Sequence, residues 1–202
     1  MTRRRGLLPL DLLPLGLLLA AAAPPAAPPA APAADHPLLA PSRDAVVAYH
    51  VAAAGGEPIN IRVGFRAGGK ALRVDLPDAS YLLAFPLLHE VTMVVPLERT
   101  TADLGWADGP QSLFLLDDRM RFTRKADATI AGQKCALWDA ALGDDHHTVC
   151  VTADGIVLRN QSQDSRGRRN MVEALLVRYE PVPDVAFQVP PGFEALAPGA
   201  PQ

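Results

Sequence analysis

Short runs in which apolar and polar residues alternate are the main pattern along the chain. Residues 59–66 alternate over eight positions, and residues 72–76 repeat the pattern after the Gly68-Gly69 pair. Such alternation is typical of a strand with one buried and one solvated face, because successive side chains point to opposite sides. The two glycines favour a turn between the runs, so this region predicts a hairpin.

Further short strands are expected on both sides of this hairpin. They are rich in β-branched and aromatic residues and end at Pro, Gly or Asp-Gly signals. Residues 97–109 have two interpretations: a short helix starts at residues 101–104, or the segment is a loop that folds over the sheet. Residues 119–130 lead into a second hairpin. The expected strands cover residues 44–53, 59–66, 72–76, 80–85, 91–95, 135–138, 149–152, 156–158 and 170–180, with a last edge strand in 187–193.

The first 34 residues have a different pattern. Three arginines at positions 3–5 precede the leucine-rich residues 7–23 and an Ala/Pro tract, the order found in an export signal. Cleavage after Ala23 and cleavage after Ala33 or Ala34 are the alternatives. The arginines also resemble a twin-arginine signal, so either export route is open. Asp11 interrupts the apolar run, which disfavours a membrane-spanning helix. We expect a periplasmic protein.

The chain's two cysteines, Cys135 and Cys150, lie in the second hairpin. In an exported chain, two cysteines outside a C-x-x-C pair favour one structural disulfide. If Cys135 directly faces Cys150, residues 141–144 form a four-residue loop. Alternation then places Leu137 on the cysteine face and Trp138 on the other face.

Charge and length limit the partners and the number of domains. Removing residues 1–34 takes away three Arg and one Asp, so the formal charge changes from −3 to −5. An acidic chain argues against nucleic acid as a partner, because duplex binding needs a basic surface. Residues 35–194 have the length of one β-rich domain, and residues 195–202 are expected to be a disordered tail.

The expected fold class is mainly β: a single-domain antiparallel, strongly curved sheet or half-barrel with at most one or two short helices. Three motifs carry a resemblance: Gly132, Cys135 and Trp138 at three-residue spacing, the Cys-Val-Thr-Ala-Asp-Gly return at 150–155, and Val-Pro-Pro-Gly-Phe at 189–193. They resemble small exported bacterial proteins of unassigned function, which are similar to the half-barrel superfamily of periplasmic outer-membrane lipoprotein carriers. The resemblance implies a curved sheet that encloses an apolar cavity under a helical lid.

Apolar residues of neighbouring strands form a candidate face for a lipid or other hydrophobic ligand. The same residues would be plain core if a lid or a second sheet covers them. The candidate ligand face consists of Ile61, Val63, Phe65, Leu72, Val74, Leu76, Met93, Val95 and Trp138.

The polar motifs point to turns rather than to catalysis. Residues 64–70 partly match a phosphate-binding loop, but Ala71 stands where Ser or Thr must be and a strand follows, so we interpret them as a hairpin turn. Residues 144–147, Asp-Asp-His-His, offer metal ligands, but adjacent histidines on a strand point to opposite faces. With no recognisable catalytic motif, we expect no enzyme activity, no cofactor and no metal.

A basic turn contains Arg166, Arg168 and Arg169. It could contact anionic lipid headgroups, as a peripheral membrane contact, or an acidic partner protein; the alternative is an exposed loop.

Three functions remain from these observations. The first is an exported non-catalytic binding protein that holds a lipid or another hydrophobic ligand, and it predicts an apolar concavity. The second is an envelope structural or protein-interaction module, and it predicts a filled core. The third is a hydrolase or metal enzyme that uses His146 and His147, and it predicts that these side chains converge in a pocket.

Overall fold

The computed structural model describes residues 35–106, 109–163 and 167–196, which belong to one unit that begins at Ala34. The predicted export signal, Arg166 and residues 197–202 lie outside the described residues. One sheet contains all the described strands: β1 (Ala45–Ala52), β2 (Ile59–Phe65), β3 (Leu72–Asp75), β4 (Tyr81–Phe85), β5 (Glu90–Val95), β6 (Thr100–Asp103), β7 (Arg121–Ile130), β8 (Gln133–Leu142), β9 (Asp145–Val151), β10 (Val157–Gln163), β11 (Arg169–Arg178) and β12 (Glu194–Ala195).

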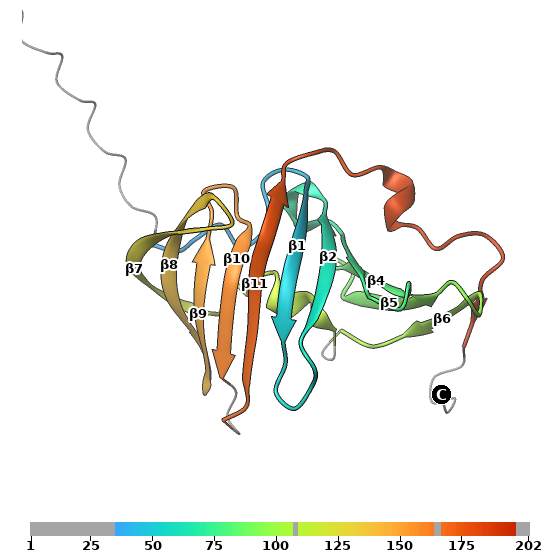
Figure 1. Ribbon diagram of the computed structural model, residues 1–202, viewed down its shortest axis with the longest axis horizontal. Helices are drawn as coiled ribbons and strands as arrows, with labels where there is room; N and C mark the ends of the chain where they lie inside the picture. The colour runs from blue at the N-terminus through green and yellow to red at the C-terminus, as the bar shows by residue number, and fades with distance from the viewer. Residues whose placement is uncertain (1–34, 107–108, 164–166, 197–202) are drawn as a thin grey trace, which may run out of the picture. The chain divides into compact units, whose positions relative to one another are not determined.

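Two antiparallel meanders make up this sheet (Figure 1). Strands β1 to β6 follow one another in order, β7 to β11 do the same, and the two meanders join where β1 pairs with β11. At the far edge, β12 pairs with β6 in parallel. The mainly β fold expected from the alternating pattern is therefore confirmed.

Two connections leave the plane of the sheet. The connection from β6 to β7 is described for residues 104–106 and 109–120, here called the crossover segment, which passes behind β1 and β11 in Figure 1. Residues 181–196, here called the C-terminal strap, run from the end of β11 to β6. Both segments contribute buried side chains to the core: Phe114 and Leu116 from the first, and Val182 and Phe187 from the second.

Helical structure among the described residues is limited to three 3-10 helices: η1 (Ala67–Gly69), η2 (Pro110–Leu113) and η3 (Asp184–Phe187). No helix in the described part is long and apolar enough to cross a membrane. Neither interpretation of residues 97–109 holds at 100–103, because Thr100 to Asp103 form β6 and pair with β5. The last edge strand lies at Glu194–Ala195 rather than within 187–193.

The Cys135–Cys150 disulfide is confirmed, with Cα atoms 5.4 Å apart. The register expected for the hairpin was wrong by two residues, because Cys150 pairs with Leu137 rather than with Cys135. The reason is the turn. Only Gly143 and Asp144 connect β8 to β9, and Gly143 has a φ of 60°. A two-residue turn with glycine first is a favoured hairpin connection, and it shortens the predicted loop.

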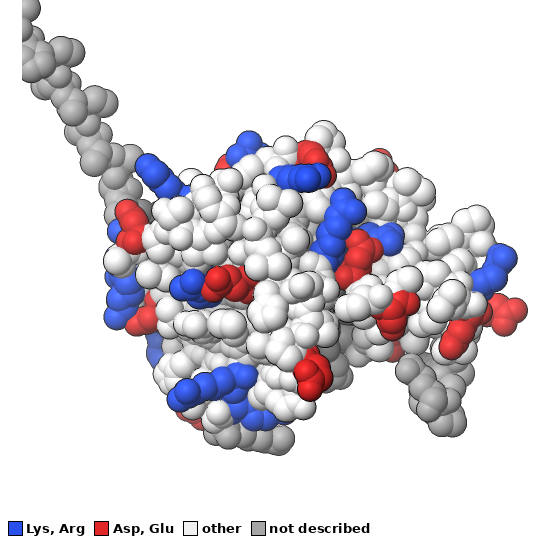
Figure 2. All heavy atoms as spheres, viewed as in Figure 1, with Lys and Arg blue, Asp and Glu red and all other residues white. Residues whose placement is uncertain are grey.

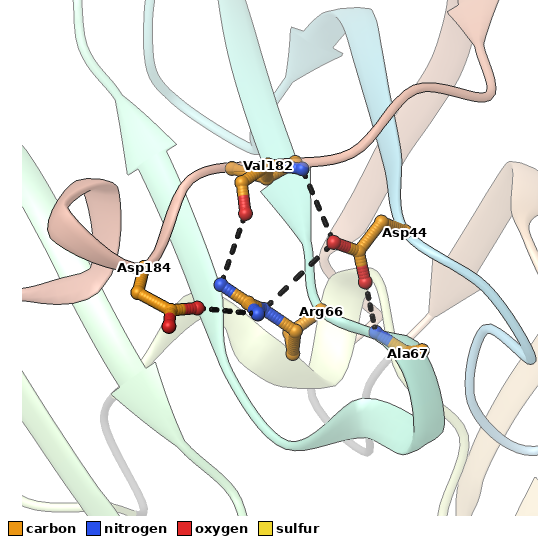
Figure 3. A network of polar contacts seen from close by, with 5 residues as sticks. All are labelled: Asp44, Arg66, Ala67, Val182 and Asp184. Carbon is orange, nitrogen blue, oxygen red and sulfur yellow. Dashed lines mark hydrogen bonds and ion pairs between the residues drawn. The ribbon is translucent and has the colours of Figure 1, made fainter.

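A polar network holds the C-terminal strap against the start of β1 and the end of β2 (Figure 3). The Asp44 carboxylate accepts hydrogen bonds from the backbone amides of Ala67, at 2.9 Å, and Val182, at 3.1 Å. Arg66 donates to the Val182 carbonyl oxygen at 3.0 Å and pairs with Asp184 at 2.6 Å. Beyond this network, Phe187 packs beside Val182 on the sheet.

Candidate functional site

The sheet has an inner face, defined here as the face that the crossover segment covers. Cross-strand pairing aligns Trp138, Val149, Asn160 and Val172 on this face. The Asn160 side-chain amide donates a hydrogen bond to the Leu113 carbonyl oxygen at 3.2 Å, which ties the crossover segment to the row. An apolar cavity for a hydrophobic ligand, as expected from the sequence, would lie between this inner face and the crossover segment.

The candidate ligand face is largely buried. Most of its residues share one hydrophobic cluster, whereas Trp138 belongs to a separate cluster with Leu116 and Val149. Leu76 and Met93 pack against the main cluster, and Val95 is half-buried. The exposed fractions of the others are Ile61 8%, Val63 0%, Phe65 1%, Leu72 1%, Val74 2% and Trp138 5%.

Phe114 of the crossover segment fills the space above these residues. Its side chain is 1% exposed, and its ring centroid lies 5.1 Å from that of Tyr49 and 6.5 Å from that of Phe65. The Tyr49 hydroxyl donates to the Val157 carbonyl oxygen at 2.8 Å, and burial raises the pKa of this hydroxyl. The protein's own Phe114 side chain thus covers this part of the inner face.

Sequence reasoning did not identify Phe114. The apolar run Leu113–Leu116 lies in a connection between strands and lacks both the alternation of a strand and the period of a helix. A run of four apolar residues inside an otherwise polar loop was the available signal, since such a run needs a buried surface to contact.

The opposite, outer face carries a hollow of about 800 Å³ across β7 to β11 and the end of β1. We call it the outer groove. Two cross-strand rows line it, together with Ala140, His147, Ser162 and Asn170, which lie between these rows. The first row is Thr123, Asp139, Thr148, Gln161, Met171 and Ala52, and the second is Arg121, Ala141, His146, Gln163 and Arg169.

The structure also places the polar residues that the sequence singled out, the two histidines and the basic turn. His146 and His147 both line the outer groove, and the His147 Nδ1 atom also lies 3.1 Å from the Asn160 side-chain oxygen. Within the described residues, no group of three or more His, Cys, Asp or Glu could hold a metal ion. Of the basic turn, Arg169 lines the outer groove, and Arg168, which precedes it in sequence, is exposed.

A second, smaller hollow of about 230 Å³ lies beside the N-terminal end of the described chain. Its lining residues are Asp35, His36, Leu39, Asp118, Met120 and Phe122. Neither hollow is lined by a residue of the candidate ligand face.

Comparisons with known proteins agree with this architecture. An uncharacterized conserved protein from Thermus thermophilus is 10% identical with a TM-score of 0.53, over 77% of this chain and 90% of that one. MucB is 9% identical with a TM-score of 0.50, over 76% of this chain and 59% of MucB, so the chain spans about three fifths of MucB. A LolA superfamily protein from Nitrosomonas europaea is 11% identical with a TM-score of 0.40, over 75% and 92%.

No protein-family model matches the chain, and no curated protein matches it. Identities near 10% show the fold alone. The curved, mainly antiparallel fold that the sequence predicted is confirmed at that level. The chain has the fold of the Thermus protein and of the part of MucB that it matches.

Proposed function

We propose that the protein is an exported, non-catalytic binding module that contacts a partner protein through its surface and carries no lipid in its interior. The burial of Phe114 between Tyr49 and Phe65 carries this proposal, because the chain's own side chain takes the place of a hydrophobic ligand. The Cys135–Cys150 disulfide supports a location outside the cytoplasm, where such bonds persist.

The free energy of burial favours the filled interior over an open one. Admitting an acyl chain would require the crossover segment to withdraw Phe114 and its half-buried neighbours Leu113 and Leu115. Each such side chain contributes about 1.5–3 kcal/mol when fully buried, so opening the interior would cost several kcal/mol before any ligand is bound. The candidate ligand face then serves as core.

Native mass spectrometry, combined with solvent extraction, tests the proposal on the processed protein recovered from the compartment to which it is exported. We expect the mass of the unliganded chain and no co-extracted lipid. A stoichiometric lipid-like mass would refute the filled-interior proposal and would establish the lipid-binding function.

Crosslinking tests the partner directly. A photoreactive amino acid replaces Gln161, which is exposed in the outer groove, and in a separate variant it replaces Glu57, which is exposed in the loop between β1 and β2. We expect one defined protein adduct from position 161 and none from position 57. Equal adducts from both positions would indicate random collisions and contradict a specific surface.

A further inference from the structure

The charges of the outer groove are unlike those of the domain as a whole. Arg121 and Arg169 lie at the two ends of its second row, both exposed, and neither forms an ion pair with any described residue. The acidic residue in the groove, Asp139, is paired with Lys125 at 2.8 Å. On a chain whose formal charge is −5 beyond residue 34, this groove therefore presents a net positive surface.

The view of the outer face agrees with this charge distribution. In Figure 2, basic side chains lie over the lower ends of β9 and β10 as these are seen in Figure 1, and acidic side chains lie mainly elsewhere on this face. An arginine that lacks a carboxylate partner can bind one, because its planar guanidinium donates paired hydrogen bonds to a carboxylate.

The remaining lining residues are mostly uncharged hydrogen-bonding groups. Gln161 and Gln163 contribute amides, and Thr123 and Thr148 contribute hydroxyls. Apart from alanines, Met171 is the apolar residue of the groove. Such a lining suits the alternating N–H and C=O groups of a peptide backbone and does not suit an acyl chain.

The dimensions favour a chain-like ligand. The first row crosses six strands from Thr123 to Ala52, and five strand spacings measure about 24 Å. The two arginines are four spacings apart, which is about 19 Å. An extended peptide covers about 3.3 Å per residue, so two acidic side chains about six residues apart would meet both arginines.

We propose that the outer groove binds an extended acidic segment of a partner protein, which lies across the strands with one carboxylate at Arg121 and another at Arg169. This proposal rests on the proposed function and adds the site and the chemistry of the partner. The segment crosses the strands, so side chains of the groove contact it. It does not pair with the edge of the sheet as an added strand.

Fluorescence anisotropy with short labelled peptides tests the site on the folded domain with its disulfide intact. The probe is a Gly/Ser peptide of eight residues with Glu at positions 1 and 7. One control peptide carries Lys at both positions, and another carries two adjacent Glu. We expect the spaced Glu peptide to bind tightest, and we expect its affinity to fall as salt is raised, since the contacts are ionic.

Substitutions locate the contacts. Arg121→Gln and Arg169→Gln should each weaken binding of the spaced peptide about tenfold, as expected for a lost charge-assisted hydrogen bond. Arg178→Gln is the matched control, because Arg178 lies at the other end of β11 and outside the groove. Urea midpoints equal to that of the wild type would show that the variants remain folded.

Four results would overturn the proposal. They are a dissociation constant above about 1 mM for the spaced peptide, equal binding of the Lys peptide, an equal loss for Arg178→Gln, or complete displacement by inorganic pyrophosphate at equal concentration, which would assign the groove to a compact anion. Failure here is distinguishable from failure of the proposed function. A lipid found by mass spectrometry refutes the filled interior, whereas the peptide measurements address the groove alone.

Discussion

Single residues decide whether the interior of this half-barrel is open or filled. Phe114 contacts aromatic side chains of two different strands, Tyr49 of β1 and Phe65 of β2, although it comes from a connection without regular strand structure. Aromatic pairs at such distances add about 0.5–1.5 kcal/mol to the burial of their area. One side chain thus links the crossover segment to the middle of the sheet.

Phe114→Ala should lower the free energy of unfolding by about 3–5 kcal/mol, because it removes a buried aromatic ring and leaves a cavity. Urea denaturation at neutral pH measures the change. Leu97→Ala is the control, since Leu97 is 86% exposed and its loss should change stability by less than about 0.5 kcal/mol. A loss below about 1 kcal/mol for Phe114→Ala would mean that the crossover segment does not pack as described.

The Asp44 carboxylate should make the free energy of unfolding depend on pH. Burial alone would raise its pKa, but the Ala67 and Val182 amides and the charge of Arg66 outweigh burial and hold the pKa of Asp44 below its usual range. A lowered folded-state pKa means that the stabilisation is present above about pH 4, the unfolded-state pKa, and is lost as pH falls through the folded-state value.

Asp44→Asn should therefore cost about 1.5–3 kcal/mol at pH 7, and the difference from the wild type should shrink below about pH 4. Urea titrations at several pH values measure both effects. Asp184→Asn provides the comparison within the same network, because Asp184 is 82% exposed and its ion pair with Arg66 should contribute no more than about 1 kcal/mol. A pH-independent deficit for Asp44→Asn would contradict the ionic origin of its contribution.

At the scale of elements, the disulfide joins two strands that already pair. Replacing both Cys135 and Cys150 by Ala should lower the free energy of unfolding by about 3 kcal/mol in the chain-entropy model, since the two cysteines are 15 residues apart in sequence. Urea midpoints of the two proteins give the difference. Reducing the wild type should reproduce the loss, and an unchanged midpoint after complete reduction would contradict it.

The strands with alternating patterns were predictable to within a residue or so. Residues 59–66 and 72–76 became β2 and β3, because their alternation matches a sheet with one buried face. The β8–β9 register was less predictable, since a two-residue turn at Gly143 and a four-residue loop both agree with the sequence. The resemblance implied a helical lid, whereas in this chain the segment over the inner face is a connection with one 3-10 helix, η2.

The outer groove could be predicted only in part. Arg169 was recognised as a candidate contact for an anionic surface from its basic neighbours. Arg121 was not, because it enters the groove only through the registers of four successive strand pairs. The carrier-type ligand face followed from the alternating pattern, but the pattern alone could not distinguish a cavity lining from plain core.

At the scale of the whole molecule, removal of the first 34 residues stays a prediction. Protein recovered from the periplasm should lack at least residues 1–23, because the charged start and leucine-rich run match an export signal. Intact-mass measurement gives the cleavage position. A chain produced in the cytoplasm without residues 1–34 is the control and should carry two free thiols. An intact N-terminus in the recovered protein would contradict the prediction.

The pairing of β1 with β11 constrains when this molecule can fold. Ala52 pairs with Met171, so one edge of β1 keeps unpaired backbone hydrogen-bonding groups until β11 is available to pair with it. Closing so long a loop costs entropy before the contact contributes anything, which makes folding slow. If export threads the unfolded chain through a membrane pore, we expect the sheet to stay incomplete until β11 has emerged. A product truncated before β11 should remain sensitive to proteases.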